Sequence, residues 1–159
     1  SIGLIGMSQG GWIAPLVATK SEDVSFVVSM SGAAVTTDEQ LLYEEINNIT
    51  EMGTYRFIAK MIAPLTTKFV QRTDFWQNIA GFDPLPYWEQ VTVPSFAALG
   101  ENDKNVPVEE SVNRFEALEK ELLIKVYPDG GHGITDPNTG SIQVEFLKDL
   151  VEFILSNTQ

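Results

Sequence analysis

The chain has 159 residues, of which 43% are apolar and 10% aromatic, enough for one domain with a sizeable core. Its net charge of −12 disfavours a nucleic-acid-binding or membrane-surface function, because an acidic surface repels phosphate backbones and anionic lipid. The absence of cysteine excludes disulfides, thiolate metal sites and a cysteine nucleophile, and leaves the cellular compartment open. No apolar run approaches the roughly 20 residues that a membrane-spanning helix needs.

The spacing of apolar residues predicts strands that alternate with helices. Short apolar or β-branched runs predict four strands, at 1–6, 24–31, 96–100 and 122–127. Helical spacing predicts three helices between and after them, at 12–19, 108–121 and 142–153. Pro15 is expected in the first turn of the first helix, where proline is tolerated. This alternation predicts an α/β fold whose parallel sheet is covered by helices on both faces.

The segment 33–90 is far longer than an ordinary connection between two strands. It holds more than half of the aromatic residues, and helix-like stretches run at 38–48 and 53–62. Pro64, with two later prolines, is expected to interrupt the helical pattern. The segment is either a group of helices with a small core of its own or a helical cap whose aromatic side chains shape an apolar pocket. Both interpretations are compatible with the sequence.

The run Gly6-Met7-Ser8-Gln9-Gly10 matches the G-x-S-x-G pattern. A strand-like run precedes it and a helix-like run follows it, which is the setting of a nucleophile elbow. In such a turn the serine takes a strained conformation that exposes its hydroxyl, and the flanking glycines are expected to avoid clashes. The alternative is a glycine-rich turn with an incidental serine. The glycine spacings match neither phosphate-binding nor dinucleotide-binding loops.

A serine hydroxyl is a poor nucleophile without a base, and His132 is the one histidine of the chain. It lies in the glycine-rich run 129–133, directly after the fourth predicted strand. A lone histidine is usually structural or merely exposed. Glycines on both sides of His132 favour a loop that presents the imidazole over the end of the sheet.

A third residue must orient the imidazole and stabilise its cation. Asp103 follows the third predicted strand, and ligands of parallel sheets gather at the carboxyl ends of the strands. Asp129 and Asp136 are alternatives near His132 in the sequence, and Glu101 is an alternative beside Asp103. The order serine, aspartate, histidine along the chain favours Asp103.

Three blocks together resemble the C-terminal portion of an α/β-hydrolase: G-M-S-Q-G-G-W at 6–12, L-G-E-N-D-K-N-V-P at 99–107 and Y-P-D-G-G-H-G at 127–133. The serine followed by Gln-Gly-Gly, with the later G-x-x-D-x-x-V-P block, is similar to bacterial esterases and prolyl-oligopeptidase-like hydrolases. The resemblance covers the whole chain. It implies a partial α/β-hydrolase fold, with parallel strands, flanking helices and a helical cap insertion at 33–90.

The resemblance also implies the roles of the site residues. Ser8 would be the nucleophile, His132 the general base and acid, and Asp103 the carboxylate that orients the imidazole. The backbone N–H of Gln9 would be one donor of the oxyanion hole. The implied activity is cleavage of a small-molecule carboxylic ester through an acyl-enzyme, with no metal or cofactor.

The sequence is also compatible with other hydrolase activities and with a non-catalytic function. A prolyl-oligopeptidase-like peptidase with a peptide substrate and an acyl-CoA thioesterase would use the same residues. The thioesterase is disfavoured because segment 33–90 offers few cations for CoA phosphates: Arg56, Lys60, Lys68 and Arg72. Their spacing of four residues within two pairs is more typical of a solvated helix face. The remaining alternatives are a non-catalytic interaction module and a folded fragment without activity.

The first four strands of the family, and the loop that supplies its second oxyanion donor, have no counterpart in this sequence. We therefore expect residues 1–159 to be a single domain that begins partway through a longer protein, which leaves any leader and the localisation undetermined. The run 2–5 would then be an edge strand with exposed apolar residues. This predicts a homodimer joined along that edge.

Overall fold

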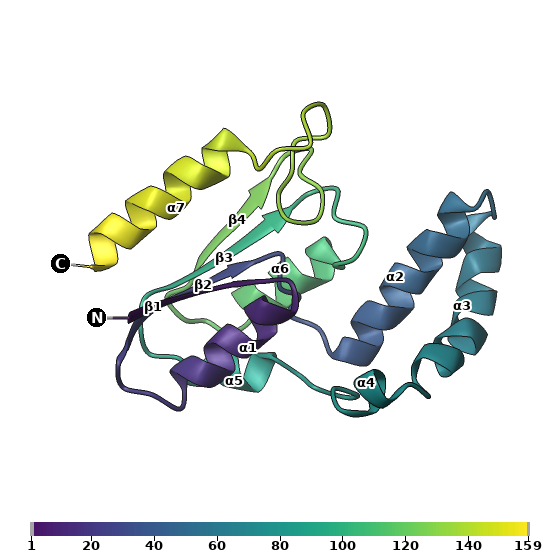
Figure 1. The fold of residues 1–159 in the computed structure, drawn as a ribbon, viewed down its shortest axis with the longest axis horizontal. Coiled ribbons are helices and arrows are strands. Elements are labelled where there is room, and N and C mark those ends of the chain that lie inside the picture. The colour runs from purple at the N-terminus through teal and green to yellow at the C-terminus, as the bar shows by residue number, and fades with distance from the viewer. Residues whose placement is uncertain (1, 159) are drawn as a thin grey trace.

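The computed structural model describes residues 2–158, which form a parallel sheet with helices on both faces and a helical projection to one side (Figure 1). The strands are β1 (Ile2–Met7), β2 (Val24–Met30), β3 (Ser95–Gly100) and β4 (Leu123–Tyr127). The helices are α1 (Gln9–Ala18), α2 (Thr37–Glu51), α3 (Arg56–Val70), α4 (Asp74–Gln77), α5 (Leu85–Gln90), α6 (Val108–Glu116) and α7 (Val144–Asn157). The predicted α/β class with a parallel sheet is confirmed.

The four strands lie in the order β1-β2-β3-β4, and every neighbouring pair is parallel. All four carboxyl ends therefore lie at the same edge of the sheet, where the loops that follow them meet. β3 is buried along its whole length, as expected for a central parallel strand. β1 is an edge strand on which Ile2, Ile5 and Met7 are exposed.

Each face of the sheet carries its own apolar core. On the face of α1, α5 and α6, Trp88 is fully buried and packs edge to face on Phe115, with ring centroids 5.5 Å apart. On the other face, α7 places Phe146 against Phe96 and Tyr127. Since Trp88 belongs to α5, the end of segment 33–90 packs into the main core, while α2 and α3 form the projection (Figure 1).

Two prolines lie inside helices, where the sequence pattern did not place them. α1 begins at Gln9 rather than Trp12, so the prediction that Pro15 lies in its first turn is wrong. Pro64 does not interrupt the helical pattern but lies within α3, which continues to Val70. An interior proline costs a helix about 3 kcal/mol. Burial of Pro15 in the α1–sheet core, and of small α3 side chains against α2, offsets this cost.

The predicted helix 108–121 is shorter in the structure, because α6 ends at Glu116. Beyond it the chain turns through Glu119, which has a positive φ of 49°. The Lys120 ammonium then donates hydrogen bonds to the carbonyl oxygens of Trp88, at 2.7 Å, and Val91. These bonds attach the turn to the α5 side of the core, and burial lowers the pKa of Lys120.

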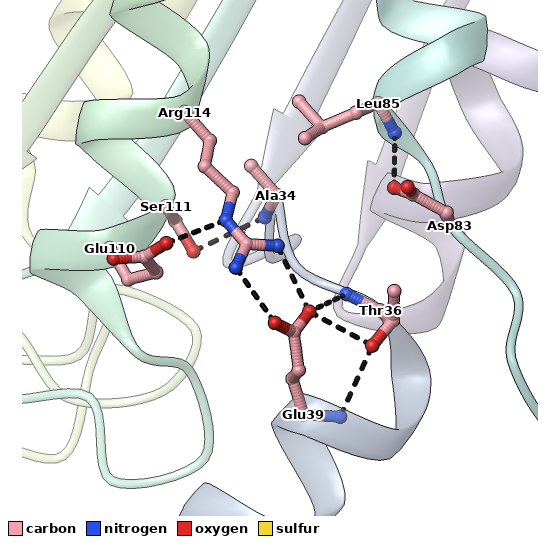
Figure 2. A network of polar contacts seen from close by, with 8 residues as sticks. All are labelled: Ala34, Thr36, Glu39, Asp83, Leu85, Glu110, Ser111 and Arg114. Carbon is pink, nitrogen blue, oxygen red and sulfur yellow. Dashed lines mark hydrogen bonds and ion pairs between the residues drawn. The ribbon is translucent and has the colours of Figure 1, made fainter.

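The start of α2 is fixed to α6 by a polar network (Figure 2). Thr36 and Glu39 form a capping box, in which the Thr36 hydroxyl accepts from the Glu39 N–H and a Glu39 carboxylate oxygen accepts from the Thr36 N–H. The Arg114 guanidinium donates to both oxygens of Glu39, at 2.7 and 2.9 Å. These bonds lower the pKa of Glu39 to about 2. A second bond between the two segments joins the Ala34 N–H to the Ser111 hydroxyl of α6, at 3.2 Å.

Within residues 2–158, no helix combines the length and the apolar character needed to cross a bilayer.

Candidate active site

Ser8 occupies the turn between β1 and α1, the strand–turn–helix setting that the sequence predicts. Its φ of 53° and ψ of −115° lie outside the regions that non-glycine residues prefer, a strain on the order of 1–3 kcal/mol. Its N–H donates to the carbonyl oxygen of Met30 at 2.8 Å, which ties the turn to the end of β2. The side chain is half-buried beside a cleft.

The two glycines that flank Ser8 have different environments. A Cβ on Gly6 would lie 2.0 Å from the Gly10 carbonyl oxygen, so the crossing of β1 and α1 requires glycine there. A Cβ on Gly10 would meet no atom within 4 Å. The expectation that both glycines prevent clashes therefore holds for Gly6 and is wrong for Gly10.

His132 and Asp103 are in direct contact, with the imidazole Nδ1 2.9 Å from carboxylate Oδ2. Asp103 is almost fully buried, and its Oδ1 accepts from the backbone N–H groups of Asn105, at 2.8 Å, and Val106, at 3.1 Å. The hydrogen bond to Asp103 raises the pKa of His132 against the opposing effect of burial, and the nearby Glu44 carboxylate raises it further. This arrangement favours an imidazole that donates from Nδ1 and keeps Nε2 available as a base.

The three alternative acidic residues make other contacts. Glu101 accepts a hydrogen bond from the Asp129 N–H at 3.1 Å, and both residues are exposed. Asp136 Oδ1 accepts from the N–H groups of Asn138 and Thr139 in its own turn. None of the three is hydrogen-bonded to the imidazole, so Asp103 is the carboxylate that contacts His132.

The serine turn and the histidine loop are both hydrogen-bonded to residues 30–31, at the end of β2. The Gly133 N–H donates to the Ser31 hydroxyl at 3.0 Å, one residue beyond Met30, which accepts from Ser8. A Cβ on Gly133 would lie 2.9 Å from the Met7 methyl group, so the histidine loop packs beside the serine turn. Within residues 2–158, no hydrogen bond joins the Ser8 hydroxyl to His132. Such bonds are often long in free enzymes and tighten when substrate binds.

Gln9 is the first residue of α1, so its backbone N–H has no intrahelical acceptor. The N-terminus of a helix favours negative charge, because its free N–H groups carry partial positive charge. The N–H that the resemblance implies as an oxyanion donor therefore stands next to Ser8 and free of the helix ladder.

A cleft of about 690 Å³ opens beside Ser8 between the sheet edge and the α2–α3 projection. Its lining comes from the serine turn, from one face of α2 and from the α3–α4 region, and includes Trp12, Gln40, Leu41, Glu44, Glu45, Val70, Phe75 and Trp76. Two of these residues are buried and hold polar atoms with no partner in residues 2–158, the Trp12 Nε1 and the Gln40 Oε1. The cleft thus combines apolar side chains with polar ones in similar measure, and it includes two carboxylates.

Gln40 and Glu44 were not singled out from the sequence. Burial raises the pKa of Glu44, whose neighbouring charges include His132, Glu45 and Asp103. In the sequence these residues are ordinary polar positions of an amphipathic helix. Which face of α2 meets the cleft depends on how the helix packs, and no local signal gives that. The residues 2–158 contain no cluster of three acidic or histidine side chains arranged to hold a metal ion.

The parallel sheet with helices on both faces, and a serine in a strained turn after β1, define the C-terminal part of an α/β hydrolase. A family model described as "BAAT / Acyl-CoA thioester hydrolase C terminal" matches residues 1–155, and the chain belongs to this family. No curated protein sequence matches the chain significantly.

Solved structures with this fold include hydrolases of different kinds. An esterase of Pyrococcus furiosus is 18% identical with a TM-score of 0.65, and the match covers 99% of this chain and 55% of the esterase. An acylaminoacyl peptidase of Pyrococcus horikoshii is 18% identical with a TM-score of 0.63, over 98% of this chain and 24% of the peptidase. An α/β hydrolase of Penicillium sp. sh18 is 15% identical with a TM-score of 0.63, over 98% of this chain and 63% of that protein. The chain thus spans about half the length of the esterase, and identities this low establish the shared fold alone.

Proposed function

We propose that this chain carries the acyl-transfer site of a serine hydrolase that cleaves carboxylic esters. The observation that supports this most directly is the 2.9 Å contact between His132 and the buried Asp103, at the sheet edge where Ser8 stands in its strained turn. Membership of a hydrolase family supports the same reaction class.

In the proposed reaction, His132 Nε2 takes the proton of the Ser8 hydroxyl as its Oγ bonds to the carbonyl carbon. The bond between the acyl carbon and the leaving oxygen then breaks, and the alcohol departs with the proton that His132 returns. Water attacks the acyl-enzyme with the same base, which releases the acid and restores Ser8. Asp103 stays ionised and stabilises the imidazolium, while the Gln9 N–H donates to the developing oxyanion. Removing one such donor costs about 10²–10³ in turnover.

The lining of the cleft favours a neutral ester with an apolar acyl group. Phe75 and Trp76 supply apolar surface for the acyl group. Glu44 and Glu45 would repel an anionic substrate.

Hydrolysis of an acyl-CoA thioester is the second candidate, because the matching family is described by that reaction. The same three side chains would perform it. The two carboxylates in the cleft weigh against CoA phosphates and are the reason we place the ester first.

One assay with matched substrates distinguishes ester hydrolysis from thioester hydrolysis. We expect an ester to be hydrolysed with a higher kcat/KM than the CoA thioester or an anilide of the same acyl chain. Ser8→Ala and His132→Ala should each lower ester turnover by at least about 10³-fold without unfolding the chain. Preference for the thioester would establish the second candidate function. Preference for the anilide would identify the protein as a peptidase. Unchanged turnover in Ser8→Ala would contradict the mechanism.

A further inference from the structure

Helix α3 buries small side chains and exposes large apolar ones. Ala59 and Ala63 are fully buried where α3 packs on α2. The α3 apolar row, with a spacing of four residues and between 61% and 74% exposed, consists of Phe57, Met61, Leu65 and Phe69. At 100° per residue this row lies on the side of α3 opposite the buried alanines. An ordinary surface helix has the reverse arrangement, with its large apolar residues toward the core.

A row of cations flanks the apolar row, on α3 and in the turn that follows it. The α3 basic row is exposed and follows the same spacing one position earlier, with a gap at Pro64. It consists of Arg56, Lys60 and Lys68 on α3 and Arg72 just beyond its end. Among residues 2–158, no carboxylate forms a salt bridge with any of the four. Arg56 donates to the neutral Asn47 side chain at 2.8 Å, and the Arg72 guanidinium lies 5.7 Å from the Phe69 ring centre. Residues 52–73 contain no acidic residue, and the row supplies four of the ten basic residues of the chain.

We propose that α3 docks this protein on an anionic phospholipid surface. Large apolar side chains beside a row of lysine and arginine are the pattern of a helix that lies in the headgroup region of a bilayer. The α3 apolar row would enter the region between headgroups and acyl chains, while the basic row would pair with lipid phosphates. The proposal does not depend on the reaction that the cleft performs.

Other binding partners would contact either the α3 apolar row or the α3 basic row, but not both. A small soluble anion would neutralise the basic row but leave four large apolar side chains in water. A second copy docked through the same helix would cover the apolar row, but residues 52–73 of that copy offer no carboxylate to the cations. An anionic lipid surface satisfies both features together.

The net charge of −12 opposes this contact, but residues 52–73 contain none of the acidic residues that produce it. The α2–α3 pair projects to one side of the sheet (Figure 1), so the acidic residues nearest to α3 are those of α2, which packs on it. At physiological ionic strength, exposed charges farther away than about 8 Å are largely screened. The global charge that disfavours a membrane-surface function in the sequence therefore does not describe the local charge of α3.

The test is co-sedimentation of the whole chain with two kinds of vesicle, phosphatidylcholine alone and an equal mixture of phosphatidylcholine and phosphatidylglycerol. We expect binding to the mixed vesicles, much weaker binding to phosphatidylcholine, and a decrease with added salt. Replacing both lysines of the row, Lys60→Gln/Lys68→Gln, should lower the partition coefficient about 25-fold, since each lysine contributes about fivefold. Met61→Ser/Leu65→Ser should lower it at least about tenfold.

The matched control is Val151→Ser/Leu155→Ser on α7, where exposed apolar side chains stand beside a single cation, Lys148, and the carboxylate of Glu152. This variant should bind the mixed vesicles as the parent does. Absence of binding to mixed vesicles by a chain shown folded by circular dichroism would overturn the proposal. So would equal binding by the lysine variant, or a dimer that Met61→Ser/Leu65→Ser dissociates in the absence of any vesicle binding.

Discussion

At the scale of single residues, Gly6 and Gly10 both flank Ser8 but only Gly10 has room for a side chain. Gly6→Ala would drive a methyl group into the backbone of α1, and we expect a loss of at least about 3 kcal/mol in the free energy of unfolding. Gly10→Ala is the matched control and should be neutral or stabilising by up to about 1 kcal/mol, because alanine favours the helix. Urea unfolding of the three chains measures both effects. Equal losses in the two variants would contradict the described crossing of β1 and α1.

The pKa of His132 predicts how activity depends on pH. A general base must be neutral, so activity should rise with pH through a pKa above the ordinary value of 6.5. The Glu44 carboxylate contributes to that raised pKa, and Glu44→Gln should therefore move the acid limb of kcat/KM to lower pH. Glu45→Gln is the control, because Glu45 also lines the cleft and is not among the groups that shift His132. Equal movement in both variants, or none in Glu44→Gln, would show that Glu44 does not act on the base.

At the scale of elements, Glu39 joins the cap of α2 to Arg114 of α6. Glu39→Gln should lower the free energy of unfolding at pH 7 by about 1 kcal/mol, since the ion pair is partly exposed and the cap is weakened. The folded pKa of about 2 lies below the ordinary 4.5, so this stability is present above pH 4.5 and is lost as pH falls toward 2. The difference between the two chains should therefore shrink over that range in urea unfolding. Glu110→Gln removes one exposed bond to Arg114 and should cost less at pH 7.

Much of the sheet and part of the site could be predicted from the sequence, because both rest on local patterns. The four strands follow from short apolar runs, and the contact of Asp103 with His132 follows from two loops at the same ends of parallel strands. The positions of Pro15 and Pro64 could not be predicted, since burial of the surrounding helix faces outweighs the local preference of proline. Gln40 and Glu44 could not be predicted for a related reason, because spacing reveals an amphipathic helix but not which neighbour covers each face.

At the scale of the whole molecule, the exposed edge of β1 leads us to propose a homodimer joined along that strand. Unpaired backbone groups of an apolar edge strand invite pairing with another strand. Light scattering at tens of micromolar should give twice the monomer mass, and Ile5→Lys should return the monomer. Leu155→Lys, at a similarly exposed apolar position on α7, should leave the dimer intact. A monomeric mass for the parent chain would contradict this proposal.

The central claim is that Ser8 is an activated nucleophile, and labelling by a fluorophosphonate tests it most directly because the probe needs no knowledge of the substrate. The intact masses of the parent chain and of Ser8→Ala should be compared after exposure to the probe, with circular dichroism showing that both are folded. We expect one adduct on the parent and none on Ser8→Ala. A folded parent chain without an adduct, or an adduct that persists in Ser8→Ala, would contradict the claim.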